Sequence, residues 1–397
     1  MVLGSFEQIK LNIMKRHSTI LVLLLLLSAS SFCKEKNEAE KILQKTSETL
    51  NRLKVISYSS YREINNFADN YFAKNSGDSY FEYNNSNVAR FQMRSTDYLQ
   101  VYNGNEYFLL DHKDKTIELE KKTIQQIKGL SLLYNSIAAL RIALPLILAE
   151  NSPKSIKDTL IEGKTYHLVR FELHKKSIEF PEGISTFDAE VTKYYKLVID
   201  QHTALPYMLF DSNSINKDQY YTKTIFTKIN TKPAAPEKKT WNSFNYKSYK
   251  PYKKPLRNPV AAVGATFPKW SLPKFDLKQQ DTLKSTDVQD KIVLMEFWIK
   301  DCGYCMEAFS GLKDLQQKYG KNIEILSINA HEKKEDVGFF YKREKPGYTM
   351  LYNGEKLAGK LGIYGYPHVI ILNKTGTVIY SSEFDKEKIE GVISKVL

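Results

Sequence analysis

The chain has 397 residues and a net charge of +13 at neutral pH, with 42% hydrophobic and 26% charged residues. This length predicts at least two domains, and the composition is that of ordinary globular protein rather than of a disordered or fibrous chain. The positive charge suits an anionic membrane surface or acidic partners, but no base-reading motif accompanies it, so nucleic acid is not an expected partner.

Residues 1–33 have the pattern of an export signal. Lys15 and Arg16 precede the apolar run Ile20–Leu27, and the small residues of Ser28–Ser31 follow it. This is the order of a secretory signal peptide, and the apolar run is too short to span a bilayer. We therefore expect export to the bacterial periplasm or cell surface, where disulfides persist.

Cys33 admits two interpretations. A cysteine just after an apolar segment resembles the lipid-acceptor cysteine of bacterial lipoproteins, which implies attachment of the protein to a membrane. That motif needs a small residue directly before the cysteine, and Phe32 stands there instead. The alternative is a cysteine that is removed with the signal or remains free.

Residues 34–230 predict an α+β domain. A helix over Ala39–Leu53 has one apolar stripe, and short β-like runs separated by polar turn clusters follow it. This spacing is typical of an antiparallel meander that forms a curved sheet or half-barrel. The predicted strands are Ile56–Ile64, Ser79–Tyr83, Val88–Met93, Tyr98–Tyr102, Tyr107–Leu110, Thr116–Leu119, Thr165–Leu173, Ala189–Ile199, Pro206–Asp211 and Tyr220–Lys228. The polar run Asn75–Asp78 predicts a turn before the second strand.

The segment Thr123–Glu150 interrupts the strands with the most apolar sequence after the signal. A transmembrane interpretation would have to bury Asn135 and Arg141 and pass Pro145, which is unfavourable. We expect this segment to be helical and to pack on the open face of the sheet.

This order of helix, meander, apolar helices and further strands resembles the LolA/LolB-like lipoprotein-carrier fold. Two hairpin phrases agree with it: Tyr102–Tyr107 leading to Asp111–Thr116, and Tyr195–Asp200 before Ala204-Leu205-Pro206. In that family an unclosed barrel with a helical lid holds acyl chains, so the resemblance implies a lipid or acyl ligand. A structural or docking role is the alternative, because a fold does not carry function by itself.

Residues 231–262 form the expected boundary. Five prolines stand there among many lysines, with aromatic residues between them. Proline and like charge predict an extended, self-repelling linker, and the aromatic residues indicate that part of it packs on one domain.

The C-terminal region, residues 263–397, contains the chemically informative motif. The apolar run Ile292–Trp298 predicts a strand buried on both faces, and the turn at Lys300-Asp301 leads to Cys302-Gly303-Tyr304-Cys305. Apolar residues then recur at helical spacing until Gly320 ends the run. Cys302 therefore lies near a helix N-terminus, where unpaired N–H groups and the helix dipole stabilise a thiolate. A four-cysteine zinc site is excluded by count, because Cys33 is the only other cysteine.

The remaining elements complete a recognisable order. Strands are predicted over Ile323–Asn329, Val369–Leu372 and Val378–Ser381, and helices over Lys333–Arg343, Glu355–Leu361 and the last residues of the chain. With the cysteine pair, its Phe-Trp lead-in and Gly365-Tyr366-Pro367, this order resembles the TlpA/ResA branch of thioredoxin-like thiol–disulfide oxidoreductases. The resemblance implies an α/β thioredoxin-like fold, protein thiol or disulfide substrates, a membrane electron donor and no cofactor.

The resemblance also assigns roles to individual residues. Cys302 attacks, Cys305 resolves the mixed disulfide, and the two close a disulfide. Pro367 is expected to be a cis-proline facing the pair, with Tyr366 and Trp298 contacting substrate; an ordinary trans-proline that opens a strand is the alternative.

Glu296 stands at the position of the buried acid in thioredoxins. TlpA/ResA-type domains often place an acid three residues after the second cysteine instead, and that position is Ala308 here. We expect Glu296 to take the role of that acid instead, and we expect it to be buried, because Leu294 and Trp298 share its strand parity. A solvent-facing strand glutamate is the alternative.

Two departures from the family pattern leave the reaction direction open. Asp301 replaces the usual Trp before the first cysteine, and its carboxylate opposes thiolate formation. Tyr304 replaces the usual Pro, and Cys-Gly-Tyr-Cys is similar to the pair of DsbC-type isomerases. The protein is therefore expected to be a disulfide reductase or a disulfide isomerase. The alternative is a lipid or lipoprotein carrier with an accessory thioredoxin domain. A peroxiredoxin needs a Thr before its cysteine, which Lys300 and Asp301 do not supply.

Overall fold

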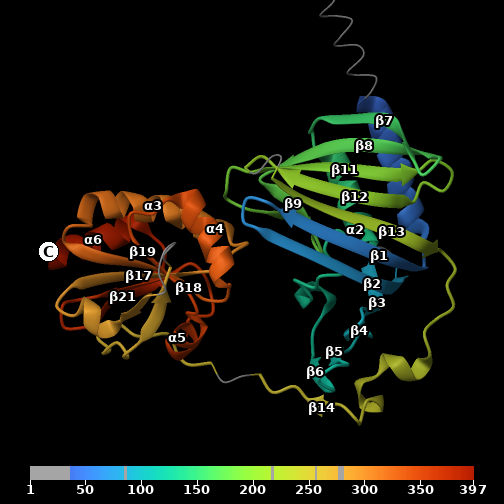
Figure 1. The fold of residues 1–397 in the computed structure, drawn as a ribbon. Coiled ribbons are helices and arrows are strands. Elements are labelled where there is room, and N and C mark those ends of the chain that lie inside the picture. Colours follow the sequence, from blue (N-terminus) through green and yellow to red (C-terminus); the bar gives the residue numbers. More distant parts are fainter. Residues whose placement is uncertain (1–35, 85–86, 216–218, 255–256, 276–280) are drawn as a thin grey trace, which may run out of the picture. The chain divides into compact units, whose positions relative to one another are not determined.

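The computed structural model describes residues 36–84, 87–215, 219–254, 257–275 and 281–397. It divides into two compact units (Figure 1). The N-terminal unit comprises Met1–Asn65 and Phe72–Tyr252, and the C-terminal unit comprises Asn66–Tyr71 and Lys253–Leu397. The expected signal peptide and Cys33 lie outside the described residues.

The N-terminal unit is built on a twelve-stranded sheet in the order β14-β6-β5-β4-β3-β2-β1-β13-β12-β11-β8-β7. The pairs from β2 to β6 and from β13 to β7 are antiparallel, whereas β14 runs parallel to β6. The strands of this unit are β1 (Val55–Asn66), β2 (Tyr71–Asn84), β3 (Asn87–Arg94), β4 (Tyr98–Tyr102), β5 (Tyr107–Asp111), β6 (Thr116–Glu120), β7 (Lys154–Ile161), β8 (Lys164–His174), β9 (Lys176–Glu179), β10 (Gly183–Thr186), β11 (Thr192–Asp200), β12 (Pro206–Asn213), β13 (Tyr220–Asn230) and β14 (Lys250–Pro251).

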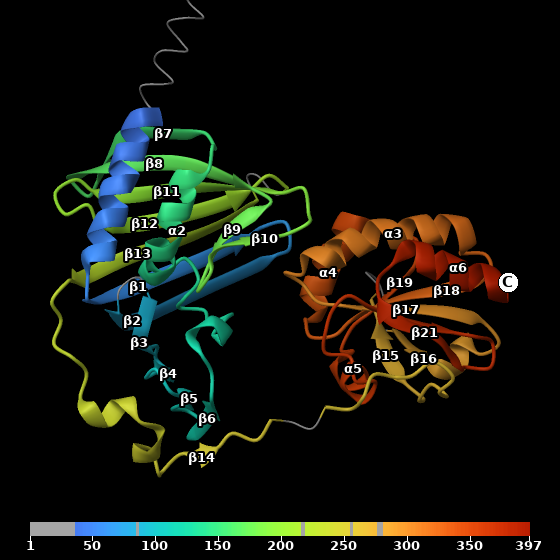
Figure 2. The ribbon, with the colours of Figure 1, turned by 180° about the vertical axis from the view of Figure 1, so that it is seen from behind.

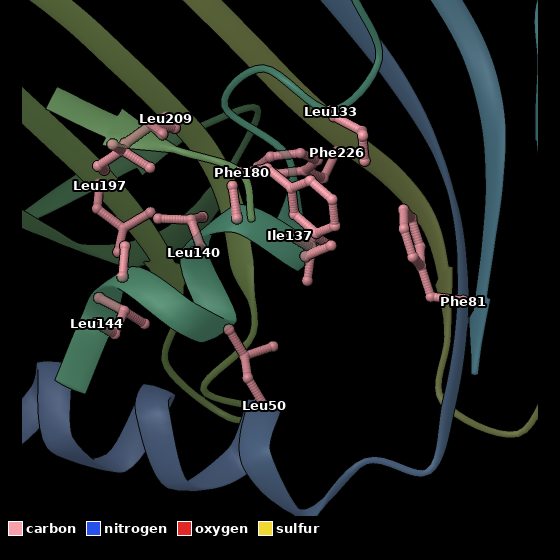
Figure 3. Packing of buried hydrophobic residues seen from close by; sticks show 14 of the residues in the cluster. Leu50, Phe81, Leu133, Ile137, Leu140, Leu144, Phe180, Leu197, Leu209 and Phe226 are labelled. Atoms are coloured by element: carbon pink, nitrogen blue, oxygen red, sulfur yellow. The ribbon is translucent and has the colours of Figure 1, made fainter. Parts of the chain in front are cut away.

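Two α-helices among the described residues accompany this sheet, one over residues 36–52 and α2 (Ile137–Ala149). Ser136 is the N-cap of α2, and its side chain accepts a hydrogen bond from the Ala139 N–H. Apolar side chains of α2 and of the strands form one buried cluster, as Figure 3 shows for Leu140, Leu144 and Leu197. The expected apolar helix on the sheet is therefore present, and side chains fill the space beneath it.

Arg141 is the charged residue that a membrane-spanning interpretation of α2 could not accommodate. It is buried, and its guanidinium donates hydrogen bonds to the carbonyl oxygens of Leu50, Asn51 and Leu53 at the end of helix 36–52. The last carbonyls of a helix lack the usual intrahelical donors, so the arginine helps to satisfy them, and Leu50 also accepts from the Leu53 N–H. No helix among the described residues combines the length and apolarity that crossing a bilayer requires.

The predicted turn at Asn75–Asp78 is wrong, because β2 runs through it. The turn lies at residues 67–70 instead. Gly77 is needed for close packing rather than for a turn: a Cβ there would lie 2.6 Å from the Arg94 carbonyl oxygen and 2.7 Å from Leu132. The sequence interpretation also missed β7, β9 and β10, which are short or have no apolar alternation.

Residues 238–251 belong to the N-terminal unit. They form the short helices η2 (Lys238–Trp241) and η3 (Ser243–Asn245) and the strand β14. Trp241 is buried against Tyr80, and the Arg90 guanidinium lies 4.4 Å from the centre of its ring. Aromatic burial therefore holds much of this proline-rich segment on the sheet, despite its positive charge.

The C-terminal unit has a seven-stranded sheet in the order β16-β15-β19-β18-β17-β20-β21. The three neighbouring strands β19, β18 and β17 are parallel, β20 is antiparallel to β17, and β21 is antiparallel to β20. The elements are β15 (Ser271–Lys274), β16 (Asp281–Lys284), β17 (Ile292–Trp298), α3 (Gly303–Tyr319), β18 (Ile323–Asn329), α4 (Lys334–Glu344), β19 (Thr349–Leu351), α5 (Glu355–Lys360), β20 (His368–Leu372), β21 (Val378–Glu383) and α6 (Lys386–Val396).

Strand β17 lies inside this sheet, between β18 and β20, and all its residues are buried. On one face of the sheet, apolar side chains of α3, α4 and α6 pack with Leu294. On the other face, apolar side chains of α5 pack with Met295 (Figures 1 and 2). A strand covered on both faces reads as a continuous apolar run, which explains why its position was predictable.

The chain joins this sheet through a segment that packs closely beside α5. The Arg257 guanidinium lies 4.8 Å from the centre of the Tyr364 ring, and the Ala261 N–H donates to the Leu361 carbonyl. Gly362 has φ +70°, and a Cβ at this position would collide with the Pro259 backbone. The segment therefore lies against the loop that precedes Tyr366 and Pro367.

Candidate active site

Cys302 and Cys305 form a disulfide at the start of α3. Cys302 is the N-cap of this helix, and the Cys305 N–H donates to its Sγ at 3.2 Å. When the pair is reduced, this N–H and the helix dipole favour a negative charge on the Cys302 sulfur. Asp301, which directly precedes it, has φ 55°.

The two sulfurs differ in their access to solvent. Cys302 is partly exposed, whereas Cys305 is 0% exposed and packs with Phe309 and Leu312 in the core. A protein disulfide can therefore reach Cys302 only, and the buried Cys305 thiol is costly to ionise.

The peptide bond between Tyr366 and Pro367 is cis. It places the Tyr366 carbonyl oxygen 3.6 Å from the Cys302 sulfur, at the end of the loop that leads into β20. The backbone of Tyr366 thus lies next to the reactive sulfur, where an extended substrate segment could pair with it.

Glu296 lies on β17 and is 0% exposed. Its Oε2 accepts a hydrogen bond of 2.8 Å from the Ser327 hydroxyl on β18. Burial raises the pKa of Glu296 to about 8, and the hydrogen bond from Ser327 opposes this rise. A carboxyl group with a pKa near neutrality can both take and release a proton under physiological conditions.

Trp298 requires a correction. It is 0% exposed, and its ring packs at 5.0 Å from Phe309 and 4.9 Å from Phe340. A side chain enclosed in this way supports the α3 face of the sheet and has no surface that a protein substrate could contact. Strand parity should have indicated this, because Trp298 shares the buried face of Leu294.

A groove of about 960 Å³ adjoins the redox pair and the cis-proline. Its walls include Arg257, Tyr304, Glu307, Tyr364, Pro367 and Phe384. Tyr304 is 71% exposed, so the residue between the two cysteines presents an aromatic ring at the edge of the groove. Sequence analysis singled out Tyr304 only as a departure from the family pattern, and it gave no signal for Arg257 or Phe384.

Two histidines flank the cis-proline. His368 lines the groove, and its Nε2 lies 3.1 Å from the Ser381 hydroxyl. Burial lowers the pKa of His368, so this ring is neutral at pH 7. His331 lies 3.3 Å from the Tyr366 hydroxyl and therefore supports the same loop from outside the groove.

The part of the chain that carries the redox pair is similar to known proteins. The family model described as AhpC/TSA family matches residues 263–381. Thioredoxin of Bacillus subtilis is 28% identical over 86 residues, which cover 22% of this chain and 83% of that protein. The C-terminal unit is a thioredoxin-like domain.

Other relatives match the same part of the chain. The thioredoxin-like protein YneN of Bacillus subtilis is 24% identical over 125 residues, or 30% of this chain and 74% of that protein. The solved structure of a thiol-disulfide oxidoreductase from Bacteroides fragilis is 23% identical, with a TM-score of 0.31, and the similarity covers 34% of this chain and 100% of that one. The thioredoxin-like domain and its disulfide-bonded pair make the protein a thiol–disulfide oxidoreductase.

Proposed function

We propose that the protein is an exported disulfide reductase of the TlpA/ResA type, which acts on cysteines of other proteins through its Cys-Gly-Tyr-Cys pair. The observation that carries this proposal is the partly exposed Cys302 at the N-terminus of α3, opposite the cis Tyr366–Pro367 bond. This arrangement suits attack on an extended protein segment. Only the Cys302 sulfur is accessible, and the backbone of Tyr366 lies beside it at the groove.

The reaction follows from the exposure of the two sulfurs. The Cys302 thiolate attacks a substrate disulfide, forming a mixed disulfide and releasing the first substrate thiolate. Cys305 then loses its proton and attacks the Cys302 sulfur, which closes the Cys302–Cys305 disulfide and releases the second substrate thiolate. Glu296, on the same face of the sheet as Cys305, is the proposed acceptor of that proton.

The proposed location rests on residues 1–33. The charged, apolar and small-residue segments of that region support export to the periplasm, and Cys33 supports membrane attachment if it is lipidated. A reductase in an oxidising compartment needs a supply of electrons, so a membrane electron donor is part of the proposal.

Isomerisation is the alternative for the same site, because Cys-Gly-Tyr-Cys also resembles the pair of DsbC-type isomerases. The two activities are separated by assaying the reduced protein on insulin and on a ribonuclease with scrambled disulfides. A reductase precipitates insulin with a stoichiometric supply of reductant and restores little ribonuclease activity. Efficient reactivation of the ribonuclease without net consumption of reductant would favour the isomerase.

The groove is the proposed site for the substrate residues that flank the reacting cysteine. Truncating an exposed aromatic residue that becomes buried on binding typically costs about 1–2 kcal/mol. Tyr304→Ala is therefore expected to raise KM for insulin roughly five- to thirtyfold, with little change for hydroxyethyl disulfide, which is too small to span the groove.

Tyr252→Ala is the matched control, because Tyr252 is also exposed and belongs to the N-terminal unit. An equal loss of activity on both substrates in Tyr304→Ala would show that this residue acts on the redox pair itself and would remove the groove from the proposal.

For the N-terminal unit, whose sequence resembles the LolA-like fold, we propose a docking role. A carrier of lipid or acyl chains is the alternative, but Ile137, Leu140, Leu144 and Ile147 of α2 already pack into the buried cluster of the sheet. An acyl chain could occupy this face only after α2 had left it.

A further inference from the structure

Glu296 and Ser327 lie side by side on β17 and β18, two neighbouring parallel strands of the thioredoxin-like domain. Their Cα atoms are in register between β17 and β18, both side chains are 0% exposed, and Ser327 Oγ lies 2.8 Å from Glu296 Oε2. Buried carboxyl groups in apolar surroundings are rare, and they usually have hydrogen-bond partners. The Ser327 hydroxyl is such a partner for Glu296.

This pair faces the helix that carries Cys305. Leu294 and Trp298 flank Glu296 on its strand and belong to the same buried cluster as Cys305. Because side chains alternate along a strand, Glu296 projects toward that cluster. Ser327 shares this direction, since it is paired with Glu296 in a parallel ladder.

The elements packed around the carboxyl group are mostly apolar. β20 places Val369 opposite Glu296, and α4 contributes Val337 and Phe340 to the same cluster. The titratable groups of this cluster are Cys305 and Tyr319 on α3, Tyr348 before β19 and Tyr380 on β21, and partly buried members at its edge are Cys302, Tyr341, Tyr352 and Tyr366. Burial and the nearby Glu296 raise the pKa of Tyr348, so the tyrosine is neutral and cannot balance a charge on the carboxylate.

The two carboxylate oxygens are not equivalent. Oε2 is occupied by Ser327, whereas Oε1 is buried and has no hydrogen-bond partner among the residues that the structure describes. A buried polar atom without a partner is costly, and it is found in functional sites where the partner is transient. The proton of Cys305 is a partner of this kind.

We propose that Ser327 is a positioning residue for the resolving step: its hydroxyl fixes Oε2 of Glu296, so that Oε1 is the atom that takes the proton of Cys305. The inference rests on the proposed function, in which Cys305 resolves the mixed disulfide. The Cys305 S–H bond breaks as an O–H bond forms at Oε1. The Cys305 sulfur then bonds to Cys302, and the bond between Cys302 and the substrate sulfur breaks, with the electron pair leaving on the substrate thiolate.

The same hydroxyl determines the pH range in which the carboxylate is available. Its hydrogen bond favours the ionised form, so removing it should raise the pH at which Glu296 loses its proton by roughly one to two units. Below that pH the rate of a base-assisted step falls tenfold per pH unit. Ser327→Ala should therefore slow resolution roughly tenfold to a hundredfold at pH 7 and leave attack by Cys302 unchanged.

The test follows the mixed disulfide by stopped flow from pH 6 to pH 10 in the full-length protein. Ser327→Ala should move the midpoint of the resolution rate to higher pH, and Ser327→Thr, which keeps the hydroxyl, should restore it. Ser310→Ala, at an exposed position on α3, is the control and should match the wild type.

Two further measurements make the outcome decisive. In a Glu296→Gln background, Ser327→Ala should have no additional effect on the pH profile, because the titrating group is gone. Infrared difference spectroscopy should follow the Glu296 carboxyl and show the same shift of its midpoint, even if no disulfide substrate were turned over. An unmoved carboxyl midpoint in Ser327→Ala, or an equal loss of rate in the Glu296→Gln background, overturns the positioning role, whereas an absence of disulfide exchange overturns the proposed function alone.

Discussion

Cys302→Ser should abolish disulfide reduction, whereas Cys305→Ser should accumulate a stable mixed disulfide with its substrate. The two outcomes differ because Cys302 is partly exposed at the N-cap of α3, while Cys305 is enclosed in the core. Without the first sulfur no covalent bond to substrate forms, and without the second that bond has no intramolecular nucleophile to break it.

Alkylation of the reduced protein compares the reactivity of Cys302 with that of Cys305 directly. Iodoacetamide at pH 7 should modify Cys302 first, and mass spectrometry of the peptides identifies the site. If Cys305 were alkylated first, the roles of the two cysteines would have to be exchanged.

In cells, mass spectrometry of the proteins trapped on Cys305→Ser would identify the physiological substrates. The double variant Cys302→Ser/Cys305→Ser is the control and should trap no protein.

Glu296→Gln should leave attack on substrate near its normal rate and slow resolution of the mixed disulfide roughly ten- to a hundredfold near pH 7. With a pKa of about 8, about a tenth of the Glu296 carboxyl is ionised at pH 7. The wild-type resolution rate should therefore rise with pH until this group is ionised, and the variant should lose that rise. Stopped-flow mixing with a model disulfide separates the two steps, and an unchanged resolution rate between pH 6 and pH 8 excludes Glu296 as the base.

Glu296 should also make the stability of the protein depend on pH. The pKa is raised from 4.5 in an unperturbed carboxyl to about 8 in the folded protein. Between these two values the folded protein holds a proton that the unfolded chain has released, so the free energy of unfolding falls as pH rises through this window. Glu296→Gln should flatten that dependence in urea unfolding curves and should be more stable than the wild type at pH 9.

Much of the thioredoxin-like domain could be predicted from its sequence, because burial and sequence pattern coincide there. Strand β17 is apolar throughout since both its faces are covered, and α3 has its apolar residues at helical spacing. The cysteine pair marks the junction between them. Burial of Glu296 could be predicted because it shares strand parity with Leu294, and this was enough to distinguish it from a solvent-facing glutamate.

The features that could not be predicted depend on contacts between residues distant in sequence. Gly77 looked like part of a turn because its true constraint, the backbone of Arg94, lies on another strand. Ser327 has no pattern of its own, and its importance appears only when β17 and β18 are placed in register. Arg257 likewise reaches the groove through packing of the segment beside α5, which composition alone describes as a linker.

The packing of residues 257–261 beside α5 determines where the thioredoxin-like domain can be cut. A fragment starting at Val263, where the family similarity starts, would lack Arg257 and Val260, and both line the groove beside the redox pair. Such a fragment would keep its cysteines and could still exchange thiols with small disulfides, but it would lack one wall of the groove that we propose as the site for protein substrates. The segment that joins the two units thus also contributes a wall of this groove, and a fragment made to study protein substrates has to include it.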